Sequence, residues 1–293
     1  MFQGVGTALI TPFRSDGSLD EGAFEKFVDW QVEEGINFLV PCGTTGENPA
    51  LTADEHRRVV ELTVKAANGR VPVLAGAGSN STPRAVELAQ QAVDLGVDGI
   101  LTITPYYNKP TPDGLLLHFG AQAKAVEKMK PGFPMIMYNV PGRTGLNMTA
   151  ETTLRMAREL PNVIGVKEAS ANMEQILSIL RERRDGFLVL SGDDAWTLPL
   201  LGCGADGVIS VASNEVPRLM RQLVDGRDAA IHNRLLPLLL GNFIESNPGP
   251  AKAALKMMGV LESDTLRPPL APMTEASRER LRAILKECAL IDQ

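Results

Sequence analysis

The 293-residue chain is poor in the residues that would assign it to a specialised class of protein. Its three cysteines (Cys42, Cys203 and Cys288) are odd in number and widely spaced, so they predict neither a disulfide framework nor a zinc site. Such cysteine usage is typical of a reducing cytoplasm, and the N-terminal segment lacks the basic and apolar regions of a signal peptide. No window approaches about 18 uninterrupted apolar residues, so we expect no transmembrane helix. We interpret the chain as a cytoplasmic protein without a membrane partner.

Positive charge and histidine are also scarce. The chain has 29 basic and 35 acidic residues, and no basic run is longer than Arg181-Glu182-Arg183-Arg184, which argues against a nucleic-acid partner. The three histidines (His56, His118 and His232) fall in expected helices or loops away from the expected catalytic face, and no HExxH pattern exists. No strand is followed by a complete GxGxxG. We therefore expect neither a metal nor a nucleotide cofactor.

Short apolar runs alternate with helical patterns along the first 211 residues, with a repeat of roughly 25 to 35 residues that is typical of βα units. Eight such units are the number that closes a (β/α)₈ barrel. An open doubly wound sheet is the alternative, but its glycine fingerprint is missing. The expected strands are Gly6–Thr11, Phe38–Pro41, Val71–Ala75, Gly99–Ile103, Met135–Tyr138, Val163–Lys167, Phe187–Leu190 and Gly207–Val211.

Helix signals lie between these runs and change character after the last one. Thr52-Ala53-Asp54-Glu55 is a capping box that opens a helix ending near Gly69. After Val211 no strand pattern remains. We expect a barrel domain over 1–213 and a helical extension packed on it over 214–293, with helices at Glu215–Val224, Asp228–Gly241, Pro250–Met258 and Thr274–Cys288.

Lys167 ends the sixth expected strand, where a lysine is unusual because lysine is rarely buried unless it is paired or used. A desolvated ammonium loses its proton more readily, and the free amine attacks carbonyl carbon. Alternatively, the head of Lys167 lies in water or pairs with Glu168. In a barrel, catalytic groups stand at the C-terminal ends of the strands, so the neighbouring strand ends bear on this choice.

Those strand ends carry phenols, hydroxyls and a guanidinium. Gly43-Thr44-Thr45-Gly46-Glu47 follows the second strand and offers hydroxyl and backbone N–H groups for a carboxylate. The chain has only three tyrosines (Tyr106, Tyr107 and Tyr138), and all of them fall at the C-terminal ends of expected strands. Arg143, after the fifth strand, could clamp a second carboxylate. Together with Lys167 this set predicts carbon–carbon bond chemistry through a Schiff base on an oxo acid.

Four motifs resemble the pyruvate-dependent class I aldolase family, in order and from Gly4 to about Leu285. The resemblance implies a (β/α)₈ lyase without a cofactor. The segment Pro141-Gly142-Arg143-Thr144-Gly145 resembles one branch of the family, whose members condense pyruvate with L-aspartate 4-semialdehyde in lysine biosynthesis through diaminopimelate. The sialic acid lyases, another branch, lack the arginine of this segment. The motifs are Gly43–Glu47, Tyr138-Asn139-Val140-Pro141, Val166-Lys167-Glu168-Ala169 and Gly207-Val208-Ile209-Ser210.

The resemblance also implies roles. Lys167 would form the imine, and Tyr138 would move protons through Thr45 to Tyr107, which would reach in from a neighbouring subunit of a homotetramer built as a dimer of dimers. Pyruvate and the semialdehyde would be the substrates. The residues implied to bind them are Thr44, Thr45, Arg143, Gly192 and Ile209.

Some members of the family bind lysine as a feedback inhibitor, and the matching positions are only partly kept. His56, Asn80 and Tyr106 remain, but Arg84 stands where a glutamate would hold the lysine ammonium, and Ala53 replaces a histidine. A cation opposite an ammonium is repulsive. We expect weak or absent inhibition by lysine.

Two other functions stay open on the sequence alone. The first is an aldolase of the same family that acts on a different aldehyde or on a sugar acid, for which Arg143 is the discriminating residue. The second is a non-catalytic barrel that binds a small acid. The second predicts a missing nucleophile or phenol, and neither is missing.

Overall fold

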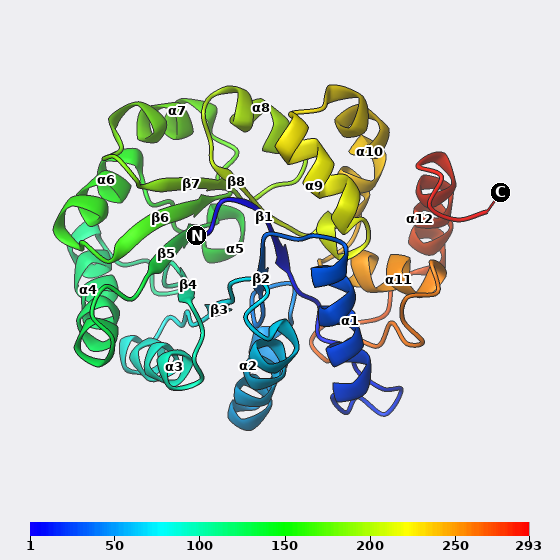
Figure 1. The fold of residues 1–293 in the computed structure, drawn as a ribbon, viewed down its shortest axis with the longest axis horizontal. Helices are drawn as coiled ribbons and strands as arrows, with labels where there is room; N and C mark the ends of the chain where they lie inside the picture. The colour runs from blue at the N-terminus through cyan, green and yellow to red at the C-terminus, as the bar shows by residue number, and fades with distance from the viewer. Residues whose placement is uncertain (293) are drawn as a thin grey trace.

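The computed structural model describes residues 1–292, so Gln293, the last residue of the predicted extension, lies outside the described residues. Within this range eight parallel strands are hydrogen-bonded in the order β2-β1-β8-β7-β6-β5-β4-β3. A parallel bridge between Leu39 and Val73 joins β2 to the segment before β3 and closes the ring. The predicted (β/α)₈ barrel is confirmed (Figure 1). The strands are β1 (Gly4–Ala8), β2 (Phe38–Val40), β3 (Leu74–Gly76), β4 (Gly99–Ile103), β5 (Met135–Asn139), β6 (Val163–Glu168), β7 (Leu188–Ser191) and β8 (Gly207–Ser210).

The helices surround the strands, and most of them begin where the sequence provides a cap. In α2 the Thr52 side chain accepts from the Glu55 N–H while the Glu55 side chain accepts from the Thr52 N–H, so the predicted capping box is present. At the starts of α1 and α7, the side chains of Asp20 and Asn172 accept from the backbone N–H three residues further on. The barrel helices are α1 (Glu21–Glu33), α2 (Ala53–Ala67), α3 (Thr82–Asp94), α4 (Pro112–Met129), α5 (Pro141–Thr144), α6 (Ala150–Glu159), α7 (Met173–Glu182) and α8 (Thr197–Gly202), with short 3-10 turns η1 (Asn48–Ala50) and η2 (Ala212–Asn214).

Two strands, β1 and β3, differ from their predicted bounds by more than one residue. β1 ends at Ala8 rather than Thr11, because the Ile10 N–H leaves the ladder and donates to Asn214 Oδ1 at 3.0 Å. β3 begins at Leu74 rather than Val71, because Pro72 has no N–H to give to a ladder. Apolar runs therefore locate the strands but not the residue at which pairing stops.

The barrel interior is filled differently at its two ends. Phe2 and Phe38 pack edge to face at the N-terminal end, with ring centroids 5.5 Å apart. Gly6 is required there, because an added Cβ would lie 2.1 Å from Cε2 of Phe38. Smaller aliphatic side chains and Tyr138 occupy the interior nearer the C-terminal end. One mouth is thus closed by aromatic rings, and the other mouth carries the polar strand ends.

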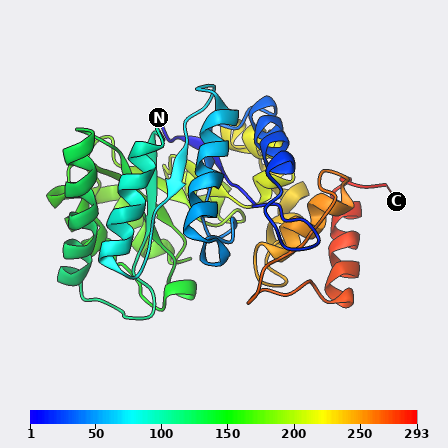
Figure 2. The ribbon, with the colours of Figure 1, turned by 90° about the horizontal axis from the view of Figure 1, so that it is seen from below.

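The chain after β8 is helical. α9 (Pro217–Gly226) packs against β1 and α8, and α10 (Ala229–Gly241), α11 (Gly249–Met257) and α12 (Glu275–Glu287) follow. Figures 1 and 2 show α10 to α12 gathered on one side of the barrel, with the C-terminus far from the N-terminus. The domain boundary between residues 213 and 214 stays a prediction. Among residues 1–292, no helix combines the length and apolar character needed to span a bilayer.

Candidate active site

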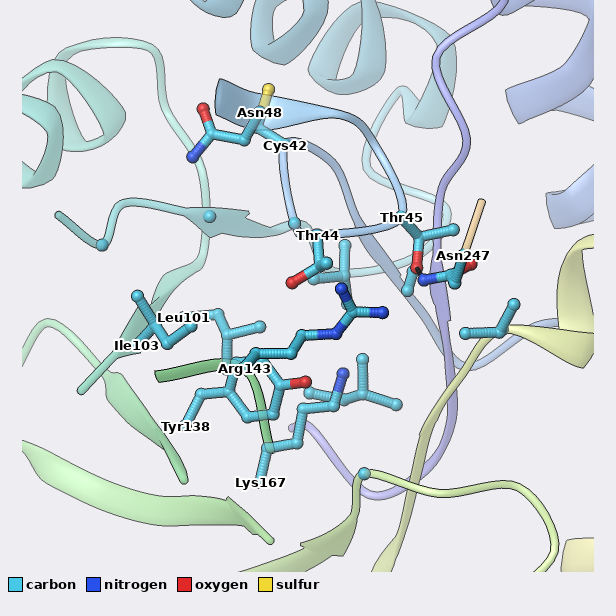
Figure 3. Close-up of a pocket in the computed structure, with 18 of the residues that line it drawn as sticks. Cys42, Thr44, Thr45, Asn48, Leu101, Ile103, Tyr138, Arg143, Lys167 and Asn247 are labelled. Atoms are coloured by element: carbon cyan, nitrogen blue, oxygen red, sulfur yellow. Dashed lines mark hydrogen bonds between the residues drawn. The ribbon is translucent and has the colours of Figure 1, made fainter. Parts of the chain in front are cut away.

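Lys167 and Tyr138 face each other at the open mouth of the barrel. The register of β5 and β6 pairs Tyr138 with Lys167, so the two side chains leave the sheet on the same face. Lys167 is only 6% exposed, and its Nζ lies 4.4 Å from the centroid of the Tyr138 ring. Figure 3 shows both side chains in the pocket. Glu168 does not pair with this lysine; its carboxylate accepts from the Asn139 amide and the Ser170 N–H.

Burial shifts the titration of both groups. Desolvation lowers the pKa of Lys167 to about 8, against the raising effect of the Asp194 carboxylate, and the Arg143 charge lowers it further. Burial raises the pKa of Tyr138 to about 12, opposed by Arg143 and by a hydrogen bond from Thr44. Near neutral pH a useful fraction of Lys167 is the free amine, while Tyr138 keeps its proton and can donate it.

The loop after β2 brings two hydroxyls to the pocket. Thr45 is 2% exposed, and Thr44 lies beside Tyr138. The loop is held by the Thr11 hydroxyl, which donates to the Gly46 carbonyl at 2.8 Å, and by the left-handed backbone at Glu47, whose φ is 54°. A loop fixed in this way presents its hydroxyls in one arrangement.

Arg143 and two backbone positions complete the pocket. Arg143 lies on the short helix α5, and Figure 3 shows its guanidinium turned into the same space as Tyr138 and Lys167. Gly192 leaves room for the lysine side chain, because an added Cβ would lie 3.2 Å from Lys167 Cε and 2.6 Å from the Ala169 Cβ. Ile209 of β8 is 1% exposed and forms part of the wall.

The structure brings most of the predicted site residues into one pocket, but not Tyr107. Seven of them line it: Thr44, Thr45, Tyr138, Arg143, Lys167, Gly192 and Ile209. Tyr106 lines it as well. Tyr107 is 89% exposed and is not among the lining residues, and its backbone is left-handed, with φ at 73°.

A second hollow adjoins this pocket and contains part of the predicted lysine-effector set. His56, Arg84 and Tyr106 line it, and Asn80 is not in the lining; its carbonyl accepts from the Asn108 amide at 3.1 Å. The expectation that His56 lies away from the catalytic face was wrong. The His56 Nε2 lies 3.0 Å from the Gly76 carbonyl at the C-terminal end of β3, so the ring reaches this strand end although His56 belongs to α2.

The sequence placed no residue of the extension in the pocket, but two of its residues reach the lining. Asn247 and Phe243 line the pocket, and Asn247 Nδ2 donates to Thr45 Oγ1 at 2.9 Å. Asn247-Pro248-Gly249-Pro250 is a turn sequence just before the expected helix at Pro250–Met258, and no periodic signal places it over the loop that follows the second strand. Among residues 1–292, no three histidine, cysteine, aspartate or glutamate side chains gather closely enough to hold a metal ion.

A buried lysine beside a phenol at the C-terminal mouth of a (β/α)₈ barrel defines an enzyme of the Schiff-base-forming aldolase class. The chain belongs to the dihydrodipicolinate synthetase family, whose family model matches residues 1–288.

Solved and curated relatives agree over nearly the whole chain. The 4-hydroxy-tetrahydrodipicolinate synthases of Koribacter versatilis and Oleidesulfovibrio alaskensis are 49% and 51% identical to it over 297 residues, which cover 99% of this chain and 97% and 99% of theirs. The chloride-inhibited dihydrodipicolinate synthase of Acinetobacter baumannii, solved in complex with pyruvate, is 40% identical. It superimposes with a TM-score of 0.94 over 99% of this chain and 100% of that one.

Proposed function

We propose that the protein condenses pyruvate with L-aspartate 4-semialdehyde to 4-hydroxy-tetrahydrodipicolinate through a Schiff base on Lys167. The observation that carries the proposal is the buried Lys167 amine, with a pKa of about 8, packed against the Tyr138 ring. Full-length similarity to relatives named for this reaction supports it. The reaction is the first committed step of lysine biosynthesis through diaminopimelate.

The first half of the reaction uses the strand-end groups already described. The neutral Lys167 amine adds to the keto carbon of pyruvate, and loss of water gives the imine. Tyr138, which keeps its proton because its pKa is about 12, donates to the departing oxygen. Thr44 and Thr45 hold the pyruvate carboxylate, and backbone groups at Gly192 and Ile209 line the pocket.

The second half uses the guanidinium of Arg143. The Tyr138 phenolate left by the first half takes a methyl proton as the imine becomes an enamine. The enamine carbon attacks the aldehyde of the semialdehyde, and the oxygen of that aldehyde takes the proton back from Tyr138. The amino group of the semialdehyde then displaces Lys167 and closes the ring. Arg143 matches the planar carboxylate of this second substrate with two parallel N–H donors, which lysine could not do.

Tyr107 fits this scheme only in an assembly. It is 89% exposed and outside the pocket of its own protomer. We propose that Tyr107 of a second copy completes the proton relay to Tyr138 in a homotetramer built as a dimer of dimers. Because the hydroxyl bonded to Tyr138 is that of Thr44, the relay passes through Thr44 rather than through Thr45. Sedimentation velocity of the purified protein tests the assembly, and a monomer that retains full activity would contradict it.

Borohydride reduction in the presence of pyruvate tests the Schiff base. Mass spectrometry should find the reduced adduct on Lys167, and Lys167→Ala should give none. Lys252 is a built-in control, because burial also lowers its pKa to about 8 but its Nζ is paired with Glu47. A label on Lys252, or no label at all, would overturn the proposal.

Replacement of Arg143 by alanine separates this function from the aldolase alternative. We expect kcat/KM for aspartate semialdehyde to fall about a hundredfold, as expected when charge-assisted hydrogen bonds worth about 1.5–3 kcal/mol are lost. Borohydride labelling by pyruvate should change far less. Unchanged turnover of the semialdehyde would favour an aldolase with a different second substrate.

A further inference from the structure

Asn247 reaches the pocket from outside the barrel. It lies between α10 and α11, is 5% exposed, and donates from Nδ2 to Thr45 Oγ1 across a sequence separation of 202 residues (Figure 3). We infer that Asn247 is a positioning residue, which orients the Thr45 hydroxyl as a donor to the pyruvate carboxylate. The inference rests on the proposed function, and it gives the helical extension a direct part in substrate binding.

The direction of the Thr45 proton follows from hydrogen-bond counting. A threonine hydroxyl has one proton and two acceptor lone pairs, while an amide nitrogen can only donate. The Thr45 hydroxyl therefore accepts from Asn247, and its own proton is free for donation to a ligand. Across the described part of the chain the Thr45 hydroxyl makes no other hydrogen bond. A bond donated into a hydroxyl also polarises its O–H and makes it a stronger donor. A carboxylate only accepts, so it is the matching ligand group.

The oxygen atom of the Asn247 amide argues against a purely structural role for this residue. Asn247 Oδ1 is buried and finds no partner among residues 1–292. An unpartnered buried acceptor is destabilising. A side chain serving only to fasten the extension would be expected to have both ends of its amide bonded within the protein. The Asn247 amide instead lies in the wall of the substrate pocket with one end bonded to Thr45.

The extension is already fastened to the same loop by a separate contact. Lys252 of α11 and Glu47, two residues beyond Thr45, form a salt bridge with side chains 0% and 1% exposed. Lys252 Nζ also donates to the Thr265 carbonyl at 2.9 Å, and Glu47 Oε2 accepts from the Arg267 N–H at 3.0 Å. Because this clamp holds without Asn247, replacing Asn247 should alter binding more than stability.

Two variants of Asn247 separate orientation from packing. Asn247→Ala removes the donor, and KM for pyruvate should rise about tenfold, with kcat lowered less, as expected for the loss of one buried hydrogen bond near a charged ligand. Asn247→Asp keeps the shape but reverses the polarity, since a carboxylate accepts the Thr45 proton and repels the substrate carboxylate. Its KM should rise about a hundredfold, on the scale of a charge-pair defect. A packing role predicts the opposite order, with the same-shaped aspartate milder than alanine.

A matched control and a double variant sharpen the test. Asn162→Asp places the same charge at another buried asparagine, 9% exposed, whose amide donates to the Ala123 carbonyl far from the pocket lining. It should lower the melting temperature and leave KM for pyruvate unchanged. If Asn247 acts through Thr45, adding Asn247→Ala to Thr45→Val should change KM by less than twofold, because contacting residues are not additive.

The outcomes distinguish the two proposals. Wild-type protein that forms no pyruvate adduct overturns the proposed function and this inference together. Wild-type protein that forms the adduct, with Asn247→Ala equal to it in KM, overturns the inference alone. A smaller rise in KM for pyruvate in Asn247→Asp than in Asn247→Ala would also overturn the inference alone. If Asn247→Asp fails to fold, KM for pyruvate of Asn247→Ala and of the double variant with Thr45→Val still tests the inference.

Discussion

The reactivity of Lys167 should be limited by its protonation below about pH 8. Its amine is 6% exposed, and burial lowers its pKa from 10.5 to about 8. Only the neutral amine attacks a carbonyl, so kcat/KM for pyruvate should rise about tenfold per pH unit below this value and level off above it. The acid limb of the profile therefore reports the environment of one nitrogen atom.

The size of the effect follows from the same two values. The difference between 10.5 and about 8 is about 2.5 pH units, which corresponds to about 300 times more free amine at pH 7 than an exposed lysine would have. About one Lys167 in ten would then be unprotonated at that pH, against fewer than one in a thousand for an exposed lysine.

Initial rates at low pyruvate and saturating semialdehyde, measured from about pH 6 to 9.5, give the profile. Arg143→Ala should move the acid limb to higher pH, because the guanidinium lowers the pKa of Lys167. Tyr138, with a pKa of about 12, should not contribute in this range. An acid limb centred near pH 10, or a flat profile, would refute the claim that burial activates Lys167.

Two further predictions concern charges outside the catalytic pair. Lys252→Met leaves Glu47 buried without its cation and should lower the free energy of unfolding by about 3–5 kcal/mol in urea titrations. Glu47→Gln combined with Lys252→Met should regain most of that loss, and a double variant as unstable as the single one would contradict the explanation. Lysine should inhibit weakly, because Arg84 lines the hollow beside His56. Half-inhibition by micromolar lysine would disprove this, and Arg84→Glu should increase sensitivity.

The elements with local signals were the ones that sequence could predict. The capping box of α2 and the apolar run of β6 are short-range patterns, and both appear where expected. Lys167, Tyr138 and Arg143 were proposed because they lie at or just after strand ends, and a barrel gathers strand ends at one mouth. The direct pairing of Tyr138 with Lys167 depends on strand register, which no local pattern determined.

The contacts of the extension could not be predicted, because they join segments far apart in the sequence. Lys252 lies in a helix whose pattern gave no reason to expect a fully buried charge. Its burial is explained by Glu47, 205 residues earlier in the chain. Asn247 was visible only as part of a turn, since an asparagine before proline is common in turns whatever its side chain contacts.

The Lys252–Glu47 clamp also bears on the order in which the protein can mature. A ribosome adding about 5–20 residues per second needs roughly 10–40 seconds to make the 205 residues that separate the two partners. By the end of that interval all eight strands have been made, but the loop bearing Thr44 and Thr45 is held only by contacts within the barrel, such as the bond from Thr11 to Gly46. A nascent barrel would therefore be compact before Asn247 and Lys252 complete the wall and the support of the pyruvate pocket.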